Sequence, residues 1–321
     1  MPSLRLLAPL LALLLCAPGA RAASPDALLR EHLWTEFQKL PPSERPRVGL
    51  ALSAGSVRGL AHVGVIQVLE DAGFPTDVVA GASMGAIVGS VYASGQPVEQ
   101  LLRFQKAVAA EAHRLLSKRR LLSLMITDSL IPTKTIEGVI SAQIGDIRFD
   151  QLQKPFACAA MDLRTGEKII FRDGPVAPAV RASASLPGLF KPLLYRHRYL
   201  SDGGVVDYIP CDLARLLGAD WVLASVTNND YTRATPTSVY HTLAQVIDIR
   251  GALLAQQQRK EADFIIDVNF GNVNFMDFRR ADEMVETGVL AAKGALEPAR
   301  ESLLLFSVSR LWKRWVPEAG R

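Results

Sequence analysis

The stretch "DVVAGASMGAIVGSVYASG", residues 77–95, decides the fold. It opens with a short β-branched run, bends through "GASMG" and continues in small and aliphatic residues that favour a buried helix. This order is the setting of a nucleophile elbow, in which a serine on a sharp bend projects its hydroxyl from the edge of a sheet. Gly81 and Gly85 have no Cβ, so the two arms of the bend can come close together. We therefore predict that Ser83 is a nucleophile, with a structural Gly-Ser turn as the alternative.

Strands and helices alternate along the chain from residue 47 onward. This order predicts an α/β domain in which helices cover a mostly parallel sheet. The predicted strands cover residues 47–52, 77–80, 156–162, 167–172, 220–226 and 263–268, and a further short strand precedes Asp202. The predicted helices cover residues 58–72, 84–94, 98–118, 133–144, 210–217, 237–260 and 279–297.

The N-terminal residues 1–22 have the composition of a secretory signal peptide. They combine an early charge, a short apolar run and a small-x-small ending. We therefore expect export to the periplasm or the medium, with an uncleaved membrane anchor as the alternative. Cys16 follows Leu15, a poor residue before a lipidated cysteine, so lipoprotein anchoring is not expected. The polar lead-in 23–46 ends in "PPSERP", whose prolines mark a boundary.

Composition excludes several classes of function. The formal net charge is +4 without a long Lys/Arg run, which argues against a nucleic-acid-binding protein. Signal-peptide removal would leave Cys158 and Cys211, which we expect to be two buried thiols because two cysteines make no disulfide framework. The sequence has no Cys/His cluster with metal-ligand spacing, so no metal site is expected.

A glycine-rich loop, "LSAGSVRGLAHVG" at residues 52–64, lies between the first predicted strand and helix. Such a loop can direct backbone N–H groups at a reacting carbonyl oxygen. A phosphate-binding loop is the competing interpretation. The segment has no G-x-x-x-x-G-K-[ST], and its glycines do not fit G-x-G-x-x-G, so we do not expect a nucleotide site.

A serine nucleophile needs a group that accepts its proton. An α/β-hydrolase places a histidine last in its triad, but none of the five histidines lies in the last 80 residues of this chain. We expect His62 to be a packed or capping residue and His241 to lie within a helix. Asp202, in "RYLSDGGVVDYIP" at 198–210, is a stronger candidate, because Gly203 and Gly204 let its carboxylate approach another loop closely. An ordinary Asp-Gly turn is the alternative.

Four segments together resemble the patatin-like phospholipase family: the glycine loop with Arg58-Gly59, "GASMG", "RASASLPGLFKP" at 181–192, and "DGG" at 202–204. The resemblance runs from about residue 47 to about 297 and implies a three-layer α/β/α sandwich with a mostly parallel central sheet. It implies Ser83 as nucleophile, Asp202 as general base, no histidine, and no metal or organic cofactor. The Gly55 and Ser56 amides would form the oxyanion hole. The supporting residues would be Arg58, Gly59, Gly81, Gly85, Gly203 and Gly204.

The chain departs from the family pattern at one place. The family usually shows G-G-G-x-[RK]-G, whereas this chain has Ala54-Gly55-Ser56-Val57-Arg58-Gly59. The N–H donors survive, but a non-glycine residue at positive φ is costly, so the loop geometry can differ. In the segment 181–192 we expect a structural role, with Pro187 and Gly188 turning the chain and no catalytic role for Ser183 or Ser185.

The resemblance implies a serine acyl hydrolase that cleaves fatty-acyl esters of (lyso)phospholipids or related lipids through an acyl-enzyme. The hydrolase domain would span residues 47–300, with a helical cap at 98–145 and an amphipathic tail at 301–321. The apolar cap stretch "LLSLMITDSLIP" offers surface for acyl chains, with a helical cap packed on the domain as the alternative. The cap and the tail could contact a membrane peripherally, but for the tail we favour a terminal helix packed on the domain. A histidine-dependent esterase and a catalytically silent lipid-binding protein are the alternatives.

Overall fold

The computed structural model of the chain describes residues 25–115, 131, 133–233 and 239–315. These belong to two compact units, one that ends at Leu40 and one that runs from Pro41 to Arg321. The described part of the first unit is mainly helix α2, Pro25–Gln38, where the sequence predicted only a polar lead-in. Pro25 at the start and Asp26 in the first turn suit a helix N-terminus. The predicted signal peptide and Cys16 lie outside the described residues.

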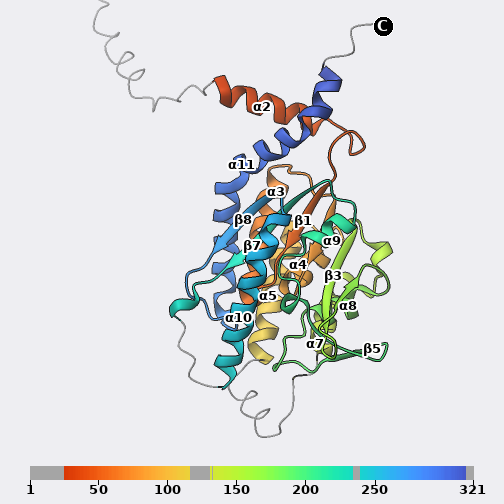
Figure 1. Cartoon of the computed structure of the whole chain (residues 1–321), viewed down its shortest axis with the longest axis vertical. Coiled ribbons are helices and arrows are strands. Elements are labelled where there is room, and N and C mark those ends of the chain that lie inside the picture. Colours follow the sequence, from red (N-terminus) through yellow and green to blue (C-terminus); the bar gives the residue numbers. More distant parts are fainter. Residues whose placement is uncertain (1–24, 116–130, 132, 234–238, 316–321) are drawn as a thin grey trace, which may run out of the picture. The chain divides into compact units, whose positions relative to one another are not determined.

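The second unit is built on one eight-stranded sheet (Figure 1). Its strands are ordered β5-β6-β3-β2-β1-β7-β8, and β4 pairs with β3. Their bounds are β1 Val48–Leu52, β2 Val78–Gly81, β3 Phe156–Asp162, β4 Lys168–Phe171, β5 Leu193–Tyr195, β6 Arg198–Asp202, β7 Trp221–Asn228 and β8 Phe264–Asn269. Each predicted strand is present within two residues of its expected ends.

The five adjacent strands β3, β2, β1, β7 and β8 run parallel to one another, whereas the pairs β3–β4, β3–β6 and β5–β6 are antiparallel. Strands β1, β2, β3 and β7 are almost fully buried, because helices cover both faces of the sheet, whereas the edge strand β8 is only partly buried. The order β2-β3-β6 matters for function. Gly81 pairs with Cys158, and Ala160, two residues further along β3, pairs with Asp202. The ends of β2 and β6 therefore lie two strands apart at the same edge of the sheet.

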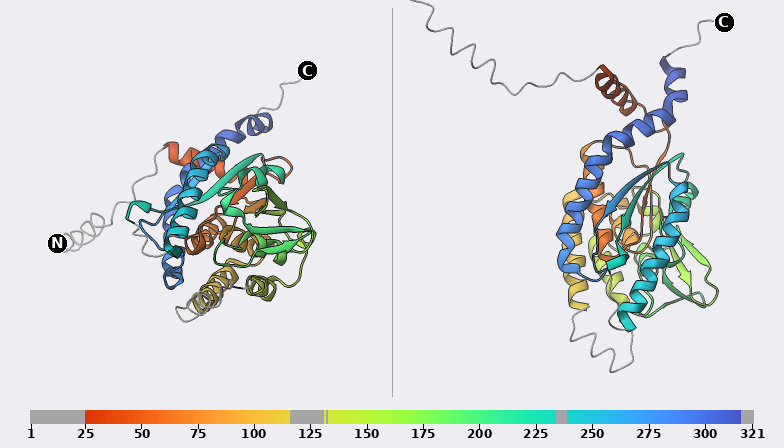
Figure 2. Two further views of the ribbon diagram at one scale, coloured as in Figure 1. Left: turned by 60° about the horizontal axis from the view of Figure 1, so that its bottom comes forward. Right: turned by 60° about the vertical axis from the view of Figure 1, so that its left-hand side comes forward.

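Helices form a layer on each face of the sheet, which confirms the predicted three-layer α/β/α fold (Figure 2). Leu52 of β1 points to α4 on one face, while Gly49 lies against α9 on the other. Helices α3 and α11 pack together on the α4 side, and α9 and α10 cover the opposite side. The bounds are α3 Ala61–Asp71, α4 Met84–Ala93, α5 Val98–Leu115, α7 Lys134–Ile144, α8 Val176–Ser183, α9 Cys211–Leu216, α10 Val239–Gln258 and α11 Ala281–Trp315.

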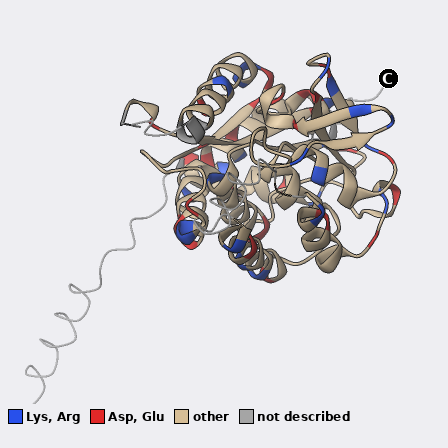
Figure 3. Ribbon diagram, turned by 90° about the horizontal axis from the view of Figure 1, so that it is seen from below, with Lys and Arg blue, Asp and Glu red and all other residues tan. Residues whose placement is uncertain are grey.

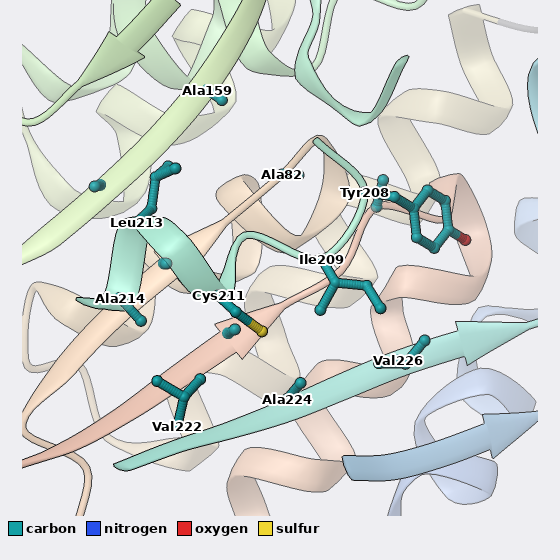
Figure 4. Close-up of a cluster of buried hydrophobic side chains, with 14 of the residues drawn as sticks. Ala82, Ala159, Tyr208, Ile209, Cys211, Leu213, Ala214, Val222, Ala224 and Val226 are labelled. Carbon is teal, nitrogen blue, oxygen red and sulfur yellow. The ribbon is translucent and has the colours of Figure 1, made fainter. Parts of the chain in front are cut away.

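One core cluster fills the space between the sheet and the α9–α10 layer (Figure 4). It consists largely of small residues from the strands, such as Ala224 and Val226, together with Leu213 and Cys211 of α9. Both Cys158 and Cys211 are buried free thiols, as expected, and burial raises the pKa of each thiol. They act as small apolar core residues.

Besides α2 and the short strand β5, which the sequence did not predict, two helices differ from expectation and one predicted segment is mostly not described. Helix α8 lies where no helix was expected, because its short "VAPAVRAS" carries proline and β-branched residues that weaken the helical pattern. Helix α11 runs unbroken from Ala281 to Trp315 and so crosses the expected boundary at residue 300. Between Leu115 and Lys134 the structure describes only Ile131 and Thr133, so most of "LLSLMITDSLIP" lies outside the described residues.

Candidate active site

The bend after β2 holds Ser83 in a strained conformation. Ser83 has φ 53° and ψ −118° and stands directly before α4. Such angles cost free energy for a non-glycine residue and are typical of a nucleophile elbow. A Cβ on Gly81 would lie 2.4 Å from the Gly85 carbonyl oxygen, and one on Gly85 would lie 2.2 Å from that of Leu52. Both positions therefore require glycine, as the sequence indicated.

Ser83 and Asp202 meet across the edge of the sheet. The Ser83 hydroxyl donates a hydrogen bond of 2.6 Å to Oδ2 of Asp202. The other carboxylate oxygen, Oδ1, accepts the Gly204 N–H at 2.8 Å. These two contacts orient the carboxylate toward the serine, so the two predicted members of the dyad share a hydrogen across 119 residues of sequence.

The surroundings of Asp202 suit a proton acceptor. The residue is only 2 % exposed, and no cation forms an ion pair with it among the described residues. Burial raises the pKa of Asp202 to about 7, and the hydrogen bonds from Ser83 and Gly204 offset part of that rise. A carboxyl group with such a pKa can accept and release a proton near neutral pH.

The glycine loop lies beside Ser83 and presents free amide groups. Gly55 and Ser56 line the same cavity as Ser83. Within the part of the chain that the structure describes, neither of their backbone N–H groups donates to a protein acceptor. The loop is held by its neighbours instead, since the Ala54 N–H donates to the Tyr208 carbonyl and the Thr227 hydroxyl donates to the Ala54 carbonyl. This arrangement leaves two N–H donors at the cavity that an incoming oxygen could accept from.

Ser56 adopts the conformation that the missing family glycine would favour. Its φ is 51°, in the left-handed region. Its hydroxyl donates a hydrogen bond of 2.7 Å to the Phe275 carbonyl, and the Val57 N–H donates to the same oxygen. The side chain therefore ties the strained loop to the segment after β8, an anchor that glycine could not provide.

Arg58 is buried below this loop. Its side chain is 1 % exposed, and Nη2 donates to Asp248 of α10 at 2.5 Å, while Nε donates to the Gly55 carbonyl at 3.3 Å. The bond to Gly55 fixes the orientation of the peptide that joins Gly55 to Ser56. The position agrees with the supporting role predicted for Arg58.

Two serines, the last residue of α8 and one just beyond it, hold both members of the dyad. The buried Ser183 hydroxyl accepts the Ser83 N–H at 3.1 Å, and the Ser185 carbonyl accepts the Asp202 N–H at 2.9 Å. Sequence reasoning assigned "RASAS" a structural role but did not foresee these bonds. Gly188, with φ 77°, makes the predicted turn beyond them.

A buried polar network anchors the loop that follows Asp202. The Asp207 N–H donates to the Gly203 carbonyl, and its carboxylate accepts from Gln258 of α10 at 2.9 Å and from Lys168 of β4 at 3.2 Å. Burial raises the pKa of Asp207 to about 6, and Lys168 offsets part of that rise. Sequence reasoning missed this network because its members are distant in the chain and none belongs to a known motif.

The remaining predicted glycines lie where two segments of the backbone approach each other closely. A Cβ on Gly59 would lie 2.7 Å from Cβ of Met84, one on Gly203 would lie 2.0 Å from the Ala159 carbonyl oxygen, and one on Gly204 would lie 2.5 Å from Cβ of Ala54. These contacts let the glycine loop, the elbow and the aspartate loop converge.

His62 is a structural residue, as the sequence indicated. It is fully buried, its Nδ1 lies 2.8 Å from the Ser225 hydroxyl, and its Nε2 lies 2.9 Å from the Ser53 carbonyl. Because a carbonyl can only accept, Nε2 carries the proton and Nδ1 accepts from Ser225. Burial lowers the pKa of His62 to about 4, so the ring is neutral and both nitrogens are engaged away from Ser83.

Ser83 opens into a cavity with mainly apolar walls. The predicted cap contributes α5 and α7 to these walls, and α10 and the segments around residues 189 and 275 complete them. Its apolar lining includes Val108, Leu115, Ile136, Ile140, Leu189 and Phe275. Ile131, the described residue of the apolar cap stretch, packs with Leu115 and Leu189 at this cavity. Among the described residues, no cluster of His, Cys, Asp or Glu could hold a metal ion.

A comparison with protein families identifies the family of this chain. A family model described as "Patatin-like phospholipase" matches residues 50–215, which is more than half of the chain. The protein belongs to the patatin-like phospholipase family, which confirms the resemblance inferred from the motifs. The matched region contains the glycine loop, the elbow, Ser183, Ser185 and the aspartate loop.

Curated relatives share this region. The chain is 34 % identical over 195 residues to an uncharacterized NTE family protein of Mycobacterium bovis, a match that covers 58 % of this chain and 50 % of the relative. It is also 34 % identical over 180 residues to lysophospholipase nte1 of Aspergillus fumigatus, covering 55 % of this chain and 12 % of that protein. The chain thus spans half or less of the length of these relatives.

Among solved structures, VipD from Legionella pneumophila is similar with a TM-score of 0.45 at 13 % identity. That match covers 78 % of this chain and 67 % of the VipD chain.

Proposed function

We propose that the protein is a serine acyl hydrolase that cleaves fatty-acyl esters of phospholipids, lysophospholipids or related lipids. The observation that carries the proposal is the hydrogen bond of 2.6 Å between the Ser83 hydroxyl and a buried carboxylate in an apolar cavity. The family supports hydrolysis of a lipid, and a lysophospholipase is among the relatives. An apolar cavity beside a nucleophile suits a fatty-acyl chain better than a polar substrate.

The proposed reaction has two steps. Asp202 accepts the proton of Ser83 while Oγ attacks the ester carbonyl carbon, and the Gly55 and Ser56 N–H groups stabilise the oxyanion. Collapse of the tetrahedral intermediate breaks the bond to the alcohol, which leaves with the proton from Asp202. Water then attacks the acyl-enzyme, gives its proton to Asp202, and the fatty acid departs as Ser83 recovers its hydrogen.

The raised pKa of Asp202 makes this exchange feasible. A carboxylate of ordinary pKa is a weak base toward an alcohol, whereas one near 7 is better matched to a working pH close to neutral. The strained elbow and the bond from Gly204 hold the donor and acceptor in place before substrate arrives.

Hydrolysis of a monomeric short-chain ester by the protein, Ser83→Ala and Asp202→Asn tests the proposal. We expect both variants to lose at least about 1,000-fold in kcat while they keep the fold, because each removes a group that takes part in bond formation. The histidine-dependent alternative requires that Asp202→Asn stays active and that alanine at one of the five histidines abolishes turnover. The third possibility is a catalytically silent lipid-binding protein. It would bind lipid without hydrolysing any ester, and a fluorophosphonate would not label Ser83.

Export of the protein by residues 1–22 remains part of the proposal. Among the described residues, no helix has both the length and the hydropathy that crossing a bilayer requires. N-terminal sequencing of the protein from an exporting host tests the expected cleavage after Ala22.

A further inference from the structure

Helix α10 carries an exposed aliphatic face that the proposed chemistry does not use. Val246, Ile249 and Leu253 are 57 %, 42 % and 52 % exposed, and Leu243 is 39 % exposed. At 100° per residue these four side chains fall within an arc of about 120° on the helix. Exposed aliphatic side chains are ordinary when they stand singly, but four on one face of one helix form a patch that calls for an explanation.

The opposite face of the same helix belongs to the cavity. Ile247 and Asp248 line it, and Gly251 lies against the ring of Tyr208, another lining residue. Leu243 connects the two faces, because its Cδ2 lies 2.4 Å from where a Cβ on Gly188 would stand, in the turn between lining residues 186 and 189. The exposed patch is therefore continuous with the rim of the cavity that contains Ser83.

Charge on α10 is distributed unequally between its two faces. Its one acidic residue, Asp248, is directed inward to Arg58. The exposed side carries Arg250 and uncharged glutamines beside the aliphatic side chains. Seen from below, the domain has Lys and Arg interspersed with Asp and Glu (Figure 3). The α10 face itself presents apolar and cationic groups without an acidic one, which suits a phospholipid surface and its phosphates.

We propose that this face of α10, formed by Leu243, Val246, Ile249 and Leu253, docks on the surface of a phospholipid bilayer and brings the mouth of the cavity to the lipid. The helix lies on the outside of the domain, with the sheet behind it (Figures 1 and 2). The choice of partner rests on the proposed function, since a cavity for acyl chains gains from a docking face at its rim. A lipid molecule would then enter the cavity without crossing water.

The test compares two triple variants of the full chain. Val246→Gln/Ile249→Gln/Leu253→Gln removes the α10 face. Leu163→Gln/Leu216→Gln/Leu290→Gln is the matched control, because these leucines are 43 %, 46 % and 71 % exposed on separate elements. Each protein hydrolyses an ester as a soluble monomer and the same ester within phosphatidylcholine vesicles, with or without phosphatidylglycerol. The fraction that sediments with vesicles is measured in a Ser83→Ala background.

We expect the α10 variant to hydrolyse the monomeric ester within about twofold of the unsubstituted chain and to lose at least about tenfold in the ratio of vesicle to monomer rates, because three half-exposed aliphatic side chains no longer enter lipid. Sedimentation with vesicles should fall in parallel, and the control should match the unsubstituted chain. An equal loss in both triple variants, or no loss in the α10 variant, overturns the proposal.

Light scattering measures the oligomeric state of each variant, because the same face could instead join two copies of the chain. If the α10 variant changes the oligomeric state while its vesicle-to-monomer ratio stays unchanged, the face joins two copies of the chain and the proposal falls. Failure of the proposed function is distinguishable, because the unsubstituted chain would then hydrolyse neither form of the ester while the sedimentation assay still reports docking.

Discussion

At the scale of the residue, the site depends on two serines that adopt positive φ. Ser83 and Ser56 have φ 53° and 51°, in sparsely populated regions that cost a non-glycine residue about 1–3 kcal/mol each. Both hydroxyls lie in defined hydrogen bonds, to Asp202 and to the Phe275 carbonyl. Their strain is therefore part of how the nucleophile and the oxyanion donors are positioned.

Substitution of Ser56 separates its strain from its hydrogen bond. Ser56→Ala keeps the strained backbone and loses the bond to Phe275, so we expect destabilisation by about 1 kcal/mol. Ser56→Gly loses the same bond but relieves the strain, so its stability should stay close to that of the unsubstituted protein. Thermal denaturation of the two variants measures the difference. A lower Tm for Ser56→Gly than for Ser56→Ala would contradict the role of φ.

Ser183 and Ser185 make a matched pair for positioning. Ser183→Ala leaves the buried Ser83 N–H without its acceptor, so we expect kcat to fall about tenfold with KM unchanged. Ser185→Ala removes only a hydroxyl that donates to the Arg181 carbonyl and keeps the backbone carbonyl that holds Asp202, so its kcat should be nearly unchanged. Steady-state kinetics on a monomeric ester tests both. Equal kcat values for the two variants would refute the assignment.

At the scale of the element, the site forms where the glycine loop and the aspartate loop meet the start of α4. The strand order brings these segments together. The elbow follows β2, the aspartate ends β6, and β3 separates them. The glycine loop reaches both because Gly204 has no side chain where Ala54 stands. The family pattern has glycine at position 54. In this chain the methyl group of Ala54 occupies the contact with Gly204 instead.

A reciprocal exchange tests that contact. Gly204→Ala would place a Cβ 2.5 Å from that of Ala54 and 3.1 Å from Oδ1 of Asp202, so we expect destabilisation by about 2 kcal/mol and at least tenfold lower kcat. Adding Ala54→Gly removes the closer clash and should restore most of the stability. Chemical denaturation of the single and double variants gives the coupling between the two positions. Strict additivity would argue against the contact.

The sequence was a good guide to elements whose local signal is strong. The β-branched runs predicted the strands, and "GASMG" and "DGG" located Ser83 and Asp202, because tight bends there require glycine. Ser183, Asp207 and Gln258 could not be assigned in this way, since their roles arise from contacts between segments distant in the chain. The short α8 was missed because its packing on neighbouring elements outweighs its weak propensity.

At the scale of the whole molecule, the buried carboxylate of Asp202 reduces the stability of the domain at neutral pH. Unfolded Asp202 ionises near pH 4, whereas in the folded state burial raises its pKa to about 7. Between these values folding takes up a proton, so this group destabilises the fold progressively as pH rises from about 4 to about 7. Buried His62, with its pKa lowered to about 4, acts in the opposite sense, because acidification below about pH 6.5 charges it only in the unfolded chain.

Asp202→Asn isolates the first of these contributions. An amide can still accept from Gly204 and donate to the Ser83 oxygen, and it carries no buried charge. We expect its Tm to exceed that of the unsubstituted protein by several degrees at pH 8 and to converge with it near pH 4. Calorimetry across this range checks the trend. A Tm difference that grows toward low pH would have the wrong sign for a carboxyl group of raised pKa.

The pairing of Ser83 with Asp202 is tested most directly by the rate at which a fluorophosphonate labels the protein as pH varies. We expect stoichiometric labelling at Ser83, with a second-order rate that falls tenfold per pH unit below an apparent pKa near 7 and is almost abolished in Asp202→Asn. Labelling at another residue, or an unchanged rate and pH profile in Asp202→Asn, would contradict the pairing.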